Sequence, residues 1–407
     1  MSKRLIVVLA VIWMVVLVAG VSSSVTLTLC GIGESNHGRV TVTEEEFDTI
    51  RRYGRLQEVF EIVQDYYYTD VSEETLITGA LRGMLDSLED PYTFYYTPEE
   101  MAASNEHQEG TYVGVGLQVL GSADGELIVT RAFMGSSALK AGIKAGDRIV
   151  MVEGTPVSAV TVQAMNDAIA MIKGESGTEV TVTIERDGAM MDMVLVRSKI
   201  NINRVEYCLL DEDVGYIMLY EFMGDDVEGF REAVQALQKQ GANGLIVDVR
   251  SNPGGLLEDV VDICDMLLPD SLIVYIENRL GERETFYSDS NMLGMPLVVL
   301  VNEMSASASE ILAGSVQDTG VGKVVGQTTF GKGIVQMVLP FYSDGAGMQL
   351  TTSTYYTPGG RCIHGTGITP DVIVYNGDYD FTTSQPDPER DAQLKKAIKV
   401  LREEMGK

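Results

Sequence analysis

Three closely spaced serines and one glycine-flanked lysine are the residues of this chain best suited to chemistry. Ser305, Ser307 and Ser309 lie in the small-residue run S-A-S-A-S, and Lys332 lies between two glycines in F-G-K-G. A serine hydroxyl becomes a useful nucleophile when a nearby base removes its proton. The chain has three histidines, none beside a recognisable Asp or Ser partner for a Ser-His-Asp triad. A lysine kept neutral by burial is therefore the base that this sequence offers.

The elements around the serines are predicted to hold them at the start of a helix. Residues 296–301 form an apolar run typical of a buried strand, and residues 310–316 have apolar residues at helical spacing. This arrangement puts the serines where free backbone N–H groups and the helix dipole favour developing negative charge. Taken singly, S-A-S-A-S is typical of a tight turn and F-G-K-G of a loop, so the residues alone leave open which serine reacts.

Found together, the two segments resemble the motif of the C-terminal processing peptidases, also called tail-specific proteases. The resemblance implies that the middle serine, Ser307, is the nucleophile and that Lys332 is the general base. It also implies that Gln336 orients the lysine, from a strand predicted at residues 334–339.

A second segment, D-V-R-S-N-P-G-G at residues 248–255, resembles the D-x-R-x-N-P-G-G of the same family. The resemblance implies an oxyanion hole, in which two backbone N–H groups stabilise the tetrahedral intermediate. We expect these donors to be Ala308, beside the nucleophile, and Gly254, with the adjacent Gly255 as the alternative. A plain strand-to-helix turn would also account for this segment on its own.

Residues 105–198 are predicted to form a separate module. The segment G-V-G-L at residues 114–117, followed by A-G-I-K-A-G-D-R-I at residues 141–149, resembles a PDZ domain. The resemblance implies that the backbone N–H groups of Val115, Gly116 and Leu117 hold a chain-terminal carboxylate. A bound peptide would add as a strand to the exposed sheet edge, with apolar side chains in a pocket beside a helix at residues 161–172.

Strands alternate with helices after residue 199, which predicts an α/β layered core. The family resemblance makes this core ClpP/crotonase-like, with an inserted β-rich PDZ domain that also contains helices. The N-terminal region shows helical patterning, and in the family such a region often mediates dimerisation, so a homodimer is expected.

The predicted organisation is a membrane anchor at residues 1–30, a helical region and start of the protease part at 31–104, the PDZ domain at 105–198, the protease core at 199–380 and a helical tail at 381–407.

The N-terminus carries a candidate membrane segment. Lys3 and Arg4 precede an uncharged run over residues 5–30, which is long enough to span a bilayer as a helix. The basic end is expected in the cytoplasm, which makes this a single-pass protein of the cell membrane with an extracytoplasmic catalytic domain. The alternative is a cleaved signal peptide, because small residues at 18–24 suit a signal peptidase, and the protein would then be secreted.

Composition excludes several classes of function. The formal net charge of −29 argues against nucleic-acid binding, and the four cysteines have no metal-ligand spacing. We expect neither a metal nor a cofactor.

The predicted function is a serine endopeptidase that recognises proteins or peptides with apolar C-terminal tails. The alternatives are a catalytically inactive PDZ scaffold and a crotonase-like hydratase.

Overall fold

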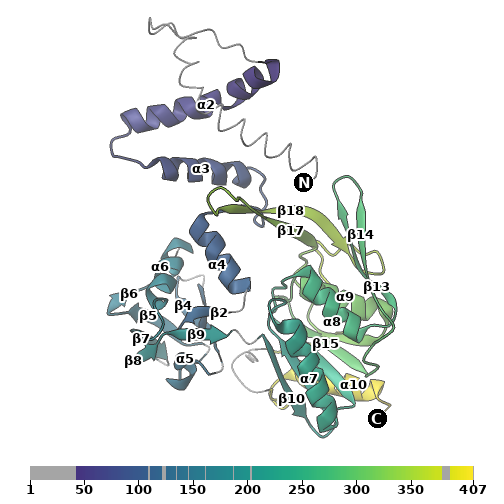
Figure 1. The fold of residues 1–407 in the computed structure, drawn as a ribbon. Coiled ribbons are helices and arrows are strands. Elements are labelled where there is room, and N and C mark those ends of the chain that lie inside the picture. Colours follow the sequence, from purple (N-terminus) through teal and green to yellow (C-terminus); the bar gives the residue numbers. More distant parts are fainter. Residues whose placement is uncertain are drawn as a thin grey trace, which may run out of the picture. The chain divides into compact units, whose positions relative to one another are not determined.

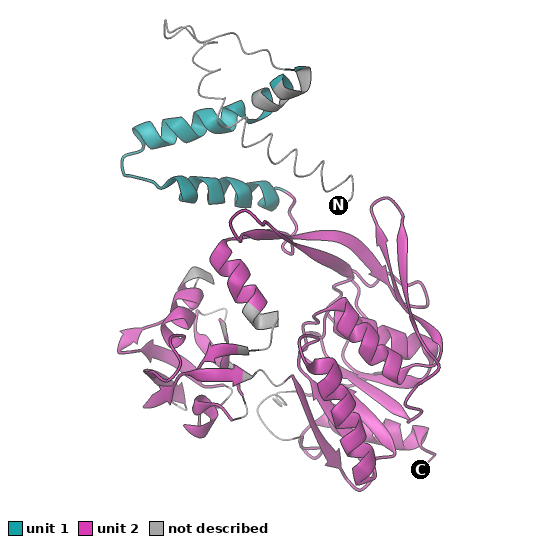
Figure 2. Ribbon diagram, in the orientation of Figure 1, with its two compact units in different colours: residues 1–87 teal, residues 88–407 magenta. Residues whose placement is uncertain are grey.

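The computed structural model describes residues 43–108, 111–121, 125–133, 135–144, 146–160, 162–186, 188–201, 204–377 and 386–406. The chain divides into two compact units, residues 1–87 and 88–407 (Figure 2), and each is described by itself. The predicted membrane segment at residues 5–30 lies outside the described ranges. Within those ranges, no helix combines the length and the apolar character needed to cross a bilayer.

The first unit contains two helices, α2 (Glu44–Tyr66) and α3 (Glu73–Asp86), as the sequence pattern predicts. The hydroxyl of Ser72 caps α3 by accepting a hydrogen bond from the Thr75 N–H, at 3.1 Å. No residue of α3 is buried, and apolar side chains of α2 are about half exposed. These are Phe47, Tyr53, Leu56, Val59 and Ile62. Residues 43–87 therefore present an apolar surface that no other described part of this unit covers.

The second unit contains the predicted α/β core (Figure 1). Its six-stranded sheet has the order β10-β11-β12-β15-β16-β19, and every pair except β10 with β11 is parallel. The strands are β10 (Val205–Leu210), β11 (Val214–Leu219), β12 (Gly244–Asp248), β15 (Leu297–Val301), β16 (Gly322–Gly326) and β19 (Val372–Ile373). Strands β11, β12 and β15 are buried along their whole length, as expected of parallel strands covered on both faces.

Helices cover both faces of this sheet. Helices α7 (Asp226–Gln240), α8 (Leu257–Leu267) and α9 (Ala308–Thr319) contribute to the larger apolar cluster. Helix α10 (Ala392–Glu404) contributes to a separate cluster on the opposite face. The helical tail predicted from residue 381 is thus part of the core.

A second sheet carries the lysine loop. Its order is β1-β18-β13-β14, and β17 also pairs with β18. The strands are β1 (Phe94–Tyr96), β13 (Ser271–Asn278), β14 (Arg283–Ser288), β17 (Ile334–Pro340) and β18 (Gly347–Tyr356). Because β1 lies beside β18, a segment from the start of this unit reaches the same sheet as the strand that follows Lys332.

The predicted PDZ domain is present, with its own apolar core. Its sheet has the order β3-β4-β5-β7-β8, with β6 beside β5, and β3 forms one edge. The elements are β3 (Leu117–Gly121), β4 (Leu127–Ala132), α5 (Ser137–Lys140), β5 (Arg148–Val152), β6 (Thr155–Pro156), α6 (Val162–Ile172), β7 (Glu179–Arg186) and β8 (Ala189–Val196). Helix α4 (Pro98–Gln108) and strand β2 (Thr111–Gly114) lead into the domain, and β9 (Ser198–Asn201), paired with β2, leads out of it.

Candidate active site

Of the three candidate serines, Ser307 is the one whose surroundings suit a nucleophile. Ser305 and Ser309 are fully buried. Their hydroxyls donate to the carbonyls of Val249 and Asn252, at 2.8 and 3.0 Å. Ser307 is partly exposed and lies at the N-terminus of α9. Burial and hydrogen bonding therefore leave Ser307 as the best candidate nucleophile, a choice among the three serines that residue type alone could not make.

The turn between β15 and α9 holds Ser307 in an uncommon backbone conformation. Its φ is 55° and its ψ is −116°, a combination that costs a non-glycine residue energy and persists only where neighbours hold it. One such neighbour is Tyr355, whose hydroxyl donates to the Ser307 carbonyl at 3.0 Å. The strand, sharp turn and helix predicted from the sequence are present, and they direct a serine to the helix N-terminus.

Lys332 lies in the loop before β17 in surroundings that favour its neutral form. Burial lowers the pKa of the Lys332 amine, while the negative charges of Asp90 and Glu310 raise it to a smaller extent. Its Nζ lies 4.5 Å from the centroid of the Tyr92 ring. Within the described ranges Lys332 forms no salt bridge, so no directly paired carboxylate stabilises its protonated form.

The residues at the start of the second unit complete the lysine's surroundings. The Asp90 carboxylate accepts hydrogen bonds from the Tyr92 N–H at 3.0 Å and the Thr93 hydroxyl at 2.7 Å. Burial tends to raise the pKa of Asp90, but bonds from Thr351 and Thr93 outweigh it and leave that pKa below its usual value. The short segment D-P-Y-T thus brings one negative charge and one aromatic ring to Lys332.

Glu310 is the main residue of this site that the sequence analysis did not single out. Its fully buried carboxylate accepts four hydrogen bonds. Oε1 accepts from the Thr329 hydroxyl at 2.6 Å and the Gly331 N–H at 2.7 Å, and Oε2 accepts from the Ser307 N–H at 2.9 Å and the Lys332 N–H at 2.8 Å. One side chain therefore ties together the backbones of both predicted dyad residues. The signal was the spacing S-x-x-E, which is typical of a helix capping box.

Gln336 lies on β17, next to a β-bulge between Val335 and itself. Its Nε2 donates to the Thr351 hydroxyl at 3.4 Å. Among the described residues it makes no hydrogen bond to Lys332. The orienting role that the sequence suggested for Gln336 stays a prediction.

The two predicted oxyanion donors lie together. A Cβ placed on Gly254 would lie 2.7 Å from the Ser307 Cβ and 2.9 Å from the Ala308 nitrogen, so only glycine allows this approach. The Gly254 N–H, however, donates to Asn252 Oδ1 at 2.8 Å in this structure. Gly255, the alternative, packs against the backbone of Phe222. Gly254 is thus the glycine beside Ser307, with its N–H engaged by Asn252.

The Asp and Arg of the same segment form a buried support beneath this loop. Arg250 donates to both carboxylate oxygens of Asp248, and to Asp391 and Gln393 at the start of α10. Asp248 also accepts from the Tyr216 hydroxyl at 2.7 Å. The C-terminal helix is thereby connected to the strand that leads into the glycine turn.

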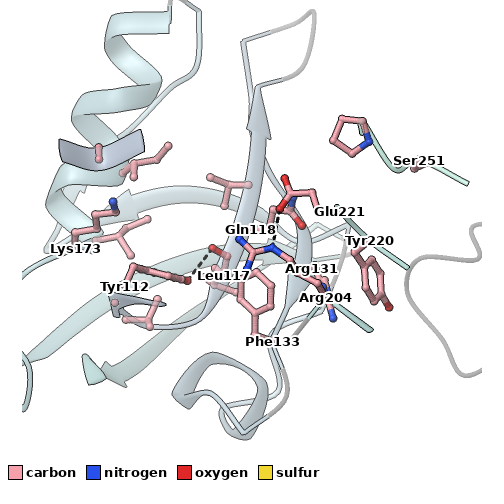
Figure 3. A pocket seen from close by; sticks show the side chains of 17 residues that line it. Tyr112, Leu117, Gln118, Arg131, Phe133, Lys173, Arg204, Tyr220, Glu221 and Ser251 are labelled. Atoms are coloured by element: carbon pink, nitrogen blue, oxygen red, sulfur yellow. Dashed lines mark hydrogen bonds and ion pairs between the residues drawn. The ribbon is translucent and has the colours of Figure 1, made fainter. Parts of the chain in front are cut away.

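A cavity of about 280 Å³ lies beside the predicted carboxylate loop of the PDZ domain (Figure 3). Val115 is buried, Gly116 has a φ of 81°, and Leu117 begins the edge strand β3. Apolar residues of the PDZ domain line the cavity together with residues of the protease core. They include Val115, Leu117, Phe133, Ile169 and Ile172, and, from the core, Tyr220, Ser251 and Pro253.

A buried arginine connects the PDZ domain to the core at this cavity. Arg131 donates to Glu206 Oε1 at 2.8 Å, and its guanidinium lies 3.5 Å from the centroid of the Tyr220 ring. The Tyr220 hydroxyl donates to the other oxygen of Glu206 at 3.0 Å.

Within the described ranges, no group of three or more His, Cys, Asp or Glu side chains is arranged to hold a metal ion.

Comparison with known proteins agrees with this architecture. The model of peptidase family S41 matches residues 213–374, that of the PDZ domain matches residues 104–185, and that of the activating protease CtpB N-terminal domain matches residues 25–100. The chain is 32% identical to the carboxy-terminal processing protease CtpA of Bacillus subtilis over 91% of its own length and 78% of the relative's. It is 33% identical to a carboxy-terminal-processing protease of Bartonella bacilliformis, over 89% of its own length and 91% of the relative's.

Among solved structures, the photosystem II D1 C-terminal processing protease is 31% identical and has a TM-score of 0.55. That match covers 82% of this chain and 94% of the other. An S41 protease from Bacteroides fragilis, at 14% identity and the same TM-score, shares the fold.

Proposed function

Because the chain belongs to peptidase family S41, among its carboxy-terminal processing serine proteases, we propose that it cleaves proteins with a Ser307–Lys332 dyad outside the cytoplasm. The observation that carries the proposal is the Glu310 carboxylate, which bonds the backbone N–H groups of both dyad residues. Such a shared anchor fixes two segments that are distant in sequence relative to one another. Catalytic groups need that kind of fixed geometry.

In the proposed mechanism, the Ser307 hydroxyl attacks the carbonyl carbon of the scissile peptide bond while Lys332 Nζ takes its proton. The N–H groups of Ala308 and Gly254 stabilise the oxyanion, once Gly254 releases Asn252. The lysine then passes the proton to the leaving amine as the C–N bond breaks. Water resolves the acyl-enzyme by the reverse sequence of proton transfers. Burial of Lys332 supports its role as base, since it increases the fraction of neutral amine.

The PDZ domain is the proposed recognition site for the C-terminal tail of the substrate. The apolar cavity beside Leu117 suits an apolar terminal side chain, and the free edge of β3 suits an added peptide strand. Because core residues Ser251 and Pro253 line the same cavity, a bound tail would lie close to the segment that carries Gly254.

Location and assembly are also parts of the proposal. Lys3, Arg4 and the apolar run at residues 5–30 support a membrane anchor with the protease on the extracytoplasmic side. The half-exposed apolar residues of α2 support a homodimer formed through the first unit, because an isolated pair of helices buries too little apolar surface to be stable alone.

The test is cleavage of an unstructured protein with an apolar C-terminus by the full chain in detergent. Wild type should cleave it, Ser307→Ala and Lys332→Ala should not, and Lys323→Ala, a lysine elsewhere in the core, should behave as wild type. Labelling of wild type but not Ser307→Ala by a fluorophosphonate would exclude the inactive scaffold. Equal cleavage by all four proteins would refute the dyad.

A further inference from the structure

Among the described strands, β3 forms an edge of its sheet, and its first outward acceptor is the Leu117 carbonyl. The Gly116 carbonyl accepts a hydrogen bond from the Phe133 N–H at 2.9 Å, and Leu117 lies opposite Ala132 in the ladder with β4. Backbone groups alternate between the two sides of an antiparallel strand. The Leu117 carbonyl therefore points away from β4, toward the edge where a peptide strand would be added.

In this structure the Leu117 carbonyl already has a partner. The Tyr112 hydroxyl donates to it at 3.4 Å, as the dashed line in Figure 3 shows. Tyr112 comes from β2, five residues earlier, so its side chain has to cross the carboxylate loop to reach Leu117. The hydrogen bond that an added peptide strand needs is thus made by the protein itself.

Gly114 allows the ring to take this path. Residues two apart in a strand share a face, and Tyr112 lies on the same face of β2 as Gly114. A Cβ on Gly114 would lie 2.5 Å from Cε2 of the Tyr112 ring. The ring also makes an edge contact with Phe133, with centroids 6.4 Å apart. The ring lines the same cavity as Leu117, so it borders the space that a terminal side chain would use.

The Tyr112 hydroxyl keeps its proton at working pH and can therefore donate to the Leu117 carbonyl. Burial raises the pKa of Tyr112 to about 12, although hydrogen bonds from the backbone of Leu117 and Gly116 oppose the rise. The Lys173 Nζ lies 5.8 Å from the ring centroid, and Lys173 also lines the cavity. The protonated hydroxyl can therefore satisfy the Leu117 carbonyl whenever the groove is empty.

We propose that Tyr112 is a plug in the peptide groove, and that a substrate tail binds when its last backbone N–H displaces the Tyr112 hydroxyl from the Leu117 carbonyl. The inference rests on tail recognition by the PDZ domain as proposed above. The plug sets a threshold for binding, because a tail must replace an existing hydrogen bond before it gains one. The 3.4 Å separation keeps this threshold low, since it is long for an O–H···O bond.

The experiment measures peptide binding to the full chain carrying Ser307→Ala, which prevents turnover. The probe is a fluorescein-labelled peptide ending in Ala-Leu-Val, with a free carboxylate or a C-terminal amide, followed by fluorescence anisotropy. Tyr112→Phe keeps the ring and removes the hydroxyl. We expect it to bind the carboxylate peptide roughly 2- to 10-fold more tightly, the effect of relieving one competing hydrogen bond.

Tyr220→Phe is the matched control, because its hydroxyl lies in the same cavity but bonds Glu206 and not the edge strand. No gain is expected there. Unchanged or weaker binding by Tyr112→Phe, or an equal gain in both variants, would overturn the plug. If the Ser307→Ala chain with Tyr112 intact prefers the carboxylate peptide but Tyr112→Phe gains nothing, the plug alone fails. If that chain binds both peptides alike, or neither, tail recognition fails as well.

Discussion

Replacing Glu310 by glutamine tests whether one carboxylate holds the active site together. The substitution keeps the side chain's shape and removes its charge. At present the two oxygens accept four hydrogen bonds, from Ser307, Thr329, Gly331 and Lys332. A glutamine amide has one oxygen with two lone pairs, and its NH₂ group only donates. With the NH₂ group in place of Oε2, the N–H groups of Ser307 and Lys332 would both face another donor. With the NH₂ group in place of Oε1, the Thr329 hydroxyl could turn to accept, and the Gly331 N–H would face another donor.

The size of the effect follows from this count. A hydrogen bond to a charged group contributes about 1.5 to 3 kcal/mol, so losing one or two costs about 1.5 to 6 kcal/mol of the free energy of unfolding. Activity should fall by about 10²-fold or more, because a small displacement of catalytic groups is enough for a loss of that size. The acid limb of the rate profile should also move to lower pH, since the Glu310 charge raises the pKa of Lys332.

Urea unfolding and the kcat for cleavage of an unstructured substrate would measure both effects. Glu303→Gln is the matched control, because Glu303 lies in the same turn but is exposed, and among the described residues it bonds only the Gln327 side chain. That variant should stay within about 1 kcal/mol of wild type and keep its activity. If Glu310→Gln were as stable and as active as Glu303→Gln, the carboxylate would not be the anchor that its hydrogen bonds indicate.

Three further predictions concern the pH dependence, the oxyanion loop and a buried acid pair. The value of kcat/KM should rise with pH along an acid limb whose midpoint lies below the usual lysine pKa, because burial lowers the pKa of Lys332. Asp90→Asn should shift that midpoint to lower pH, and a shift to higher pH in the rate profile would contradict the geometry. Gly254→Ala should reduce kcat by about 10²-fold or more, because its Cβ would meet Ser307 at 2.7 Å, while circular dichroism should show a folded protein. Burial, with a neighbouring carboxylate, raises the pKa of Asp226 to about 7, so the folded state loses stability as pH rises through that value. Asp226→Asn should therefore raise the free energy of unfolding relative to wild type, and by more at pH 8 than at pH 5. Urea titrations should show a difference between the two gains on the order of 2 kcal/mol. Equal gains at pH 5 and pH 8 would contradict the raised pKa of Asp226.

Much of this architecture could be predicted from short-range patterns. Apolar runs and alternating elements indicated the α/β core, and the ordered glycine segments indicated the PDZ domain. Both are local signals, since a strand buried on both faces must be apolar along its length and a carboxylate loop requires glycine near the peptide. The turn before α9 was predictable for the same reason.

The choice among the serines shows where local patterns end. All three have the same side chain within five residues, and only tertiary packing buries Ser305 and Ser309 while leaving Ser307 partly exposed. Packing likewise places Gly254, and not Gly255, beside Ser307 and Ala308. Tyr92 contacts Lys332 although it lies more than two hundred residues earlier in the chain, because β1 pairs with β18.

Residue type and spacing thus establish which chemical groups are present and which local elements carry them, because they govern strands, turns and helix starts. Tertiary packing establishes which of those groups meet and in which direction their pKa values move. Burial lowers the pKa of Lys332, and Glu310 links two distant backbones. Tyr112 reaches the Leu117 carbonyl, which in our proposal a substrate tail would use. Desolvation and hydrogen bonding across the fold depend on the packing of segments far apart in the chain, which no local pattern records.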